Sequence, residues 1–260
     1  MSAARLTARQ IGFENRSFWR NPPAAFFTIA FPLMFLLIFN LVFGSEDIPI
    51  GGGVTISGST FYVPAIAAFS VITACYTNIA ISVATARDLG ILKRVRGTPL
   101  PPAAYLLGRI AHASLMGLLL VAIVTLAGML FYGVDPPAGS MPAFVLTVLV
   151  GAGAFCSLGL ALTAVIPNAA AAPAVVNASI LPLLFISNVF IPVHRAPDWL
   201  ITVSRFFPVR HFADATTAAF VPDSIGPAFV LDWVDLAVVA AWGVAGLLLA
   251  TRFFSWEPRR

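Results

Sequence analysis

The sequence is poor in charge. Asp, Glu, Lys and Arg make up only 10% of its 260 residues, whereas 59% are hydrophobic and the mean hydropathy is +0.93. Soluble domains carry about 25% charged residues, so this composition excludes an ordinary soluble domain and indicates an integral membrane protein. The net charge is +4, but the chain has no polar domain that would bind nucleic acid, so this function is disfavoured. We assign the positive charge instead to the cytoplasmic side of a membrane.

Residue types that carry catalytic or redox chemistry are scarce. The two cysteines, Cys75 and Cys156, lie inside apolar segments and indicate neither a disulfide nor a metal or redox site. The chain has no His-Glu-x-x-His or Gly-x-Ser-x-Gly pattern, and its only lysine, Lys93, lies outside any phosphate-loop motif. The sequence therefore predicts no catalytic residue, metal or cofactor in this chain. Any ATP hydrolysis would belong to a separate subunit.

Acidic residues are absent from the middle of the apolar segments. All eleven lie at segment ends or in loops. An ion-coupled transporter usually places an acid or base within a span, so this pattern argues against proton or sodium coupling. If the chain moves a substrate uphill, its energy comes from another subunit.

Long apolar runs predict an all-α membrane protein, with residues 1–260 forming a single transmembrane domain. Six segments are long enough to cross a bilayer core: 24–43, 60–86, 103–134, 142–166, 169–191 and 233–254. The fourth contains small residues that allow close helix packing: Gly151, Gly153, Ser157 and Gly159. Six spans place both termini on one side, together with every Lys and Arg outside 192–228, and the positive-inside rule makes that side cytoplasmic.

Two further regions flank these segments. Residues 3–20 fit an amphipathic helix in the membrane interface, or alternatively a disordered basic tail. Its arginines fall on one stripe: Arg5, Arg9, Arg16 and Arg20. Residues 192–228 are too polar to span and too apolar for a free loop. They fit short outer helices that lie at the interface or dip into it.

The densest positive charge lies in the stretch 87–102, RDLGILKRVRGTPLPP. Gly90 permits a sharp turn after the second segment, and prolines from Pro99 onward stop the helix and stiffen its link to the third. Apolar residues give one helical face for a partner groove: Ile91, Leu92 and Val95. Basic residues are placed to pair with acids or lipid phosphates: Lys93, Arg94 and Arg96. The alternative is an ordinary basic loop that only fixes topology.

Two motifs make nearly the whole chain resemble the permease, or membrane subunit, of a type-2 ABC exporter. The stretch from Asp88 to Leu100 is similar to the family's acidic-x-Gly-x-Leu-Lys-Arg…Thr-Pro-Leu coupling loop, where a second acid often stands at the position of Arg87. The stretch from Leu183 to Pro208 is similar to its Ser-Gly…Phe-Pro…Pro-x-Trp-Leu…x-Pro signature, with Asn188 in place of Gly. The drug- and lipid-exporter permeases of the daunorubicin-resistance kind are the nearest match.

The resemblance implies a bacterial plasma (inner) membrane assembly. Two permeases, identical or sister chains, would pair above two ABC ATPase subunits that carry ATP and Mg. A short coupling helix within 87–98 would sit in a groove of the ATPase. The residues implied in this contact are Asp88, Gly90, Leu92, Lys93, Arg94, Arg96, Thr98 and Pro99.

Spans 2 and 5 would line the substrate path, and the dominance of Phe and Leu favours a hydrophobic or amphipathic cargo such as a drug, a lipid or a lipid-linked product. Polar residues on these spans would contact substrate, or would form helix–helix hydrogen bonds: Thr73, Asn78, Asn177, Ser187 and Asn188. The outer region would form a lid, or a plain interfacial anchor, around Pro192, Pro197, Trp199, Phe207 and Pro208.

Two other functions stay open. A lipid-modifying membrane enzyme would use the His and Arg residues of the outer region: His194, Arg195, Arg210 and His211. A membrane assembly factor without a substrate would need none of these side chains.

Overall fold

A computed structural model describes residues 3–51, 54–192, 196–220 and 233–257. Five helices are long and apolar enough to cross a membrane: α2 (Pro22–Phe43), the continuous helix Gly58–Asp88, α6 (Pro102–Tyr132), α7 (Met141–Leu162) and α11 (Trp233–Phe253). Gly58–Asp88 comprises α3 (Gly58–Ile72), a π-helical turn η1 (Thr73–Thr77) and α4 (Asn78–Asp88). The shorter helices are α1 (Ala3–Trp19), α5 (Ile91–Arg96), α8 (Ala172–Ile186), α9 (Asp198–Ser204) and α10 (Pro208–Ala218).

The fold is therefore a multi-helix membrane bundle, as its hydropathy predicts, but the fifth segment differs from the expected span 169–191. Helix α8 has only 15 residues, about 22 Å of helix at 1.5 Å per residue, against a hydrocarbon core of about 30 Å. It begins at Ala172 rather than at residue 169, because residues 163–171 form the connection from α7 and Pro173 lies in the first helical turn of α8. It ends at Ser187, and Asn188 follows with a left-handed φ of 58°.

The helix Gly58–Asp88 forms the centre of the bundle. Its α3 part is buried along almost its whole length and packs against α2, α6 and α10, while η1 and α4 pack against α7. At 31 residues, the helix is about 46 Å long and therefore exceeds a bilayer core of about 30 Å. The surplus carries Asp88 and the following α5 to one end of the bundle.

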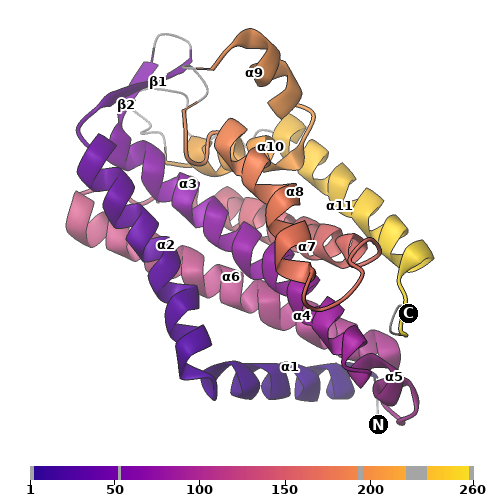
Figure 1. Cartoon of the computed structure of the whole chain (residues 1–260). Coiled ribbons are helices and arrows are strands. Elements are labelled where there is room, and N and C mark those ends of the chain that lie inside the picture. The colour runs from indigo at the N-terminus through magenta and orange to yellow at the C-terminus, as the bar shows by residue number, and fades with distance from the viewer. Residues whose placement is uncertain (1–2, 52–53, 193–195, 221–232, 258–260) are drawn as a thin grey trace.

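The two ends of the bundle differ in content (Figure 1). Helix α1, which crosses the bundle axis, lies at the same end as α5 and the end of α11. The opposite end holds α9 and a two-stranded antiparallel hairpin of β1 (Asp47–Gly51) and β2 (Val54–Ser57). This small hairpin was not predicted, but the rest of the described secondary structure is helical, in agreement with the all-α expectation. Ile48 and Ile56 bury its inner face against Phe61 and Tyr62.

The outer region splits into two unlike helices. Helix α9 is exposed along most of its length, whereas α10 is a core element, with Val209, Phe212 and Ala213 fully buried. The ring of Phe212 packs on Phe155 of α7, with centroids 5.3 Å apart. Helix α10 is therefore part of the bundle rather than a surface anchor. The remainder of the predicted region 192–228 includes 193–195 and 221–228, which lie outside the described residues.

Candidate functional site

The stretch after span 2 forms the short helix α5, shorter than the expected 87–98 because α4 continues through Asp88. Gly90 adopts φ 69°, a left-handed conformation that favours glycine, and this turn redirects the chain between the two helices. Thr98 closes the end of α5, since its hydroxyl donates to the carbonyl of Val95 at 2.7 Å. The predicted sharp turn and short helix are therefore both present.

Helix α5 has one buried and one exposed face. The basic side chains Lys93, Arg94 and Arg96 are exposed, as are Thr98 and Pro99. Leu92, expected to face a partner groove, is instead 0% exposed and belongs to the core of this chain. Its neighbours Ile91 and Val95 pack against the same core. The apolar face that was expected to contact a partner thus anchors α5 to its own bundle. Its burial there removes apolar surface from water, which stabilises the position of α5.

Two residues beside α5, Arg87 and Leu89, were not among the predicted contact residues. Leu89 is 62% exposed in the turn before α5, so it is an apolar side chain at this end that a partner can cover. Arg87 points the other way and is only 1% exposed. The family pattern often has an acidic residue at the position of Arg87, but nothing in the sequence predicted that the Arg87 side chain is buried.

Arg87 and Asp88 join the end of α4 to the turn 163–171, which connects α7 with α8. The Arg87 guanidinium donates to the carbonyl oxygens of Thr163, at 2.7 Å, and Ile166. The Asp88 carboxylate accepts from the backbone N–H of Ala169 at 3.0 Å. Positive charge thus lies at the C-terminal end of α7 and negative charge ahead of α8, the placement that helix dipoles favour. Asp88 therefore has a partner inside the chain.

The polar residues expected along the substrate path do not form one cluster. Thr73 and Asn78 lie in or next to η1 and line one hollow beside α2. Asn177 is exposed on α8, while Ser187 is fully buried and Asn188 donates to Asp214 of α10 at 2.6 Å. Asparagine tolerates the left-handed backbone at position 188 better than most residues, which is consistent with glycine in the family pattern. Spans 2 and 5 meet elsewhere, where the hydroxyls of Tyr76 and Ser179 are 2.7 Å apart.

The π-helical turn had no signal in the sequence. Such turns are frequent at functional sites because they redirect side chains within a helix. Here η1 faces Gly159 of α7, where an added Cβ would lie 2.6 Å from the carbonyl oxygen of Tyr76. The predicted close packing through small residues is therefore found at Gly159, whereas Gly153 has nothing within 4 Å of an added Cβ.

The proposed outer gate residues divide between the core and the surface. Pro192 and Pro208 are buried, Pro197 precedes α9, and Trp199 is 67% exposed. The segment around Phe207 is held on α11, because the indole of Trp242 donates to the carbonyl oxygen of Phe206 at 3.0 Å and stacks near Phe207.

Arg210 and His211 act as structural links. Arg210 contacts Asp214 at 3.3 Å and donates to Ser204 at 2.7 Å. His211 shares hydrogen bonds with Asp235 of α11 and with the carbonyl oxygen of Arg205. His194 and Arg195 lie outside the described residues. Within the described ranges, no group of three or more His, Cys, Asp or Glu residues could hold a metal ion.

A comparison with known protein families agrees with the multi-helix membrane architecture. The model of the family described as ABC-2 type transporter matches residues 9–221, so the chain belongs to the ABC-2 type transporter family. It is a multi-pass membrane protein that fits the membrane domain of a type-2 ABC permease.

Two curated relatives are described as "Probable multidrug ABC transporter permease YbhR", one from Escherichia coli strain K12 and one from Escherichia coli O157:H7. Each is 25% identical over 193 residues, which is 74% of this chain and 52% of the relative. The chain therefore spans about half the length of the curated relatives it matches.

Proposed function

We propose that this chain is the transmembrane subunit of an ATP-driven exporter and that α5 receives the motion of a separate ATPase. The observation that carries the proposal is the construction of α5. Its basic side chains are exposed, its apolar side chains are locked into the bundle, and it directly follows the central helix. A push on such a helix moves the bundle, whereas a flexible loop would absorb it.

We propose the rest of the assembly by analogy with type-2 ABC exporters. Two copies of the permease, or one copy and a sister chain, would pair over two ATPase subunits that bind ATP and Mg. The end with α1 and α5 would face the cytoplasm of a bacterial cell, with both termini on that side of the plasma membrane and α1 in the interface. The exposed arginines of α1 support this orientation, because positive charge is retained on the cytoplasmic side.

The cargo would be hydrophobic or amphipathic. The relatives' description as multidrug permeases supports this class, as does the apolar character of the bundle. The lipid-enzyme alternative has less support, since Arg210 and His211 already have partners that fix helices rather than face an open cavity.

Reversing the basic charge on α5 tests the proposal. The double variant Lys93→Glu/Arg94→Glu should lose most of its co-purifying ATPase when the tagged chain is extracted from its native membranes. The introduced glutamates would repel the acidic groups that we expect on the ATPase, at a cost of several kcal/mol. The measurement is the Mg-dependent ATPase activity that elutes with the chain.

The matched control is Arg205→Glu, because Arg205 is also an exposed arginine but directly follows α9, which lies at the opposite end of the bundle from α5 (Figure 1). It should retain the ATPase of the unmodified chain. Equal ATPase recovery with the double variant would refute the role of α5, and absence of any ATPase from the unmodified chain would refute the exporter itself.

A further inference from the structure

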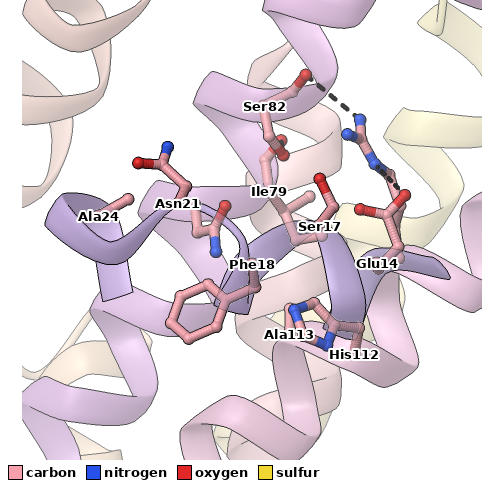
Figure 2. A pocket seen from close by; sticks show the side chains of 11 residues that line it. Glu14, Ser17, Phe18, Asn21, Ala24, Ile79, Ser82, His112 and Ala113 are labelled. Atoms are coloured by element: carbon pink, nitrogen blue, oxygen red, sulfur yellow. Dashed lines mark hydrogen bonds and ion pairs between the residues drawn. The ribbon is translucent and has the colours of Figure 1, made fainter. Parts of the chain in front are cut away.

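A polar hollow of about 290 Å³ lies between α1, α4 and α6, at the end of the bundle that α1 covers (Figure 2). Its wall includes Glu14 and Phe18 of α1, Asn78 and Ser82 of α4, and Arg109 and His112 of α6. In a helix bundle that is otherwise apolar, polar groups lining an open hollow require partners.

The charges of the hollow are mutually neutralised. Arg109 Nε contacts Glu14 Oε1 at 3.0 Å, and a second guanidinium nitrogen donates to the carbonyl oxygen of Ser82 at 3.2 Å. Gln10 donates to the same Glu14 oxygen at 2.8 Å. The described residues give the other oxygen, Oε2, no hydrogen-bond partner, and Figure 2 shows it turned toward Ser17 and the hollow. The hollow therefore offers one carboxylate oxygen and no uncommitted cation.

The neutral polar groups of the hollow are uncommitted. His112 is only 7% exposed and packs edge-on against the ring of Phe18, with ring centroids 5.9 Å apart. Neither of its imidazole nitrogens bonds to a protein group in the part of the chain that is described. The side chains of Ser17, Asn21 and Asn78 line the same space and likewise have no hydrogen-bond partner among the described residues. A polar ligand in the hollow would therefore find hydrogen-bonding groups of this chain that are free to bind it.

An apolar hollow of about 400 Å³ continues from the polar one. Both hollows are lined by Phe18, Ala24 and Asn78, so they adjoin at these residues. The second runs along α2 and η1, past Phe27 and Phe31. Thr28 and Thr73 present little polarity to it, because their hydroxyls donate to carbonyls of their own helices. Together the hollows have a polar part and an apolar part, which match the polar head and the apolar chain of an amphiphile.

We propose that the two hollows form one binding site for a zwitterionic phospholipid with a primary ammonium head group, of the phosphatidylethanolamine class. The ammonium group would contact the free oxygen of Glu14, and the phosphate would accept hydrogen bonds from His112, Asn78 and Asn21. One acyl chain would lie along α2 and η1. An anionic phospholipid fits less well, because the only cation in the hollow, Arg109, is committed to Glu14 and Ser82.

The proposal goes beyond export, since it concerns a ligand that this chain alone would bind. It also gives Thr73 and Asn78 a place beside a lipid, whether that lipid is a cargo or a permanent component. Failure to co-purify an ATPase would leave this inference intact, and failure to bind the lipid would leave the exporter proposal intact.

The test uses the full chain in detergent with two photoactivatable phospholipids that carry the same diazirine acyl chain, one phosphatidylethanolamine and one phosphatidylglycerol. Cross-linked peptides are mapped by mass spectrometry. We expect peptides covering 18–31 and 73–78 to be labelled about tenfold more by the ethanolamine lipid. Ala24→Trp should remove this labelling by filling the junction of the hollows.

Ala30→Trp is the matched control, because Ala30 lines a different hollow along α2, together with Trp19 and Phe26. It should leave the labelling unchanged. Size-exclusion profiles verify that both variants fold. If Ala24→Trp fails to fold, Glu14→Gln replaces it and should abolish the preference for the ethanolamine lipid. Labelling spread evenly over all helices, equal labelling by the two lipids, or unchanged labelling of a folded Ala24→Trp variant would each overturn the proposal.

Discussion

Arg87→Met should lower the free energy of unfolding by about 3 kcal/mol. For a chain of this size this loss corresponds to a thermal midpoint about 6–12 °C lower. Methionine fills most of the space but cannot donate to the carbonyl oxygens of Thr163 and Ile166, which then remain unpaired. The thermal midpoint is measured in detergent by the loss of the monodisperse size-exclusion peak.

Two further variants make this result specific. Arg94→Met removes an exposed arginine seven residues after Arg87 and should leave the midpoint within about 1–2 °C, because exposed substitutions cost little. Arg87→Lys should be intermediate, since a lysine keeps the charge but lacks the planar fork that reaches two carbonyls. A midpoint of Arg87→Met equal to that of Arg94→Met would mean that the contacts with the turn 163–171 contribute nothing.

Gly159→Leu should yield little folded protein, and the smaller change Gly159→Ala should cost about 1–3 kcal/mol. An added Cβ at this position would lie 2.6 Å from the carbonyl oxygen of Tyr76 and 3.1 Å from its Cα. Both atoms are backbone atoms of η1, so no side-chain rotation relieves the contact. The helices α7 and η1 must separate, which loosens the centre of the bundle.

Gly153→Ala is the control on the same helix. An added Cβ there has nothing within 4 Å, and alanine is the better helix former by about 1 kcal/mol. We expect an unchanged or higher midpoint in the size-exclusion assay. A Gly159→Ala protein as stable as Gly153→Ala would show that α7 and η1 do not pack as closely as described.

Hydropathy predicts the large elements well. The expected segments 24–43, 103–134 and 233–254 differ from α2, α6 and α11 by no more than two residues at either end. This agreement has a physical basis, since a helix in lipid must satisfy its backbone internally and shows this as one long apolar run. The short helix after Gly90 was also predictable, because a glycine and several prolines bound it.

The direction in which side chains point was not predictable in the same way. Leu92 and Arg87 lie in one charged stretch, yet both are buried. Leu92 belongs to the core cluster, and Arg87 donates to carbonyls of the turn 163–171, which is distant in sequence. The hairpin near Ile48 and Ile56 does have a signal in the sequence, since apolar residues alternate on both sides of a glycine run. The hollow beneath α1 depends on four separate helices, so no local pattern reveals it.

The shortness of α8 has a consequence for how the chain is made. Its C-terminal end is closed by α10, because Asn188 donates to Asp214 and Ser187 is fully buried. A chain emerges from the ribosome N-terminus first, so α8 is complete before the residues that close its end exist. A helix too short to cross lipid cannot satisfy its ends there alone. We infer that α8 takes its final position only after α10 has been synthesised, which makes this part of the bundle the last to assemble.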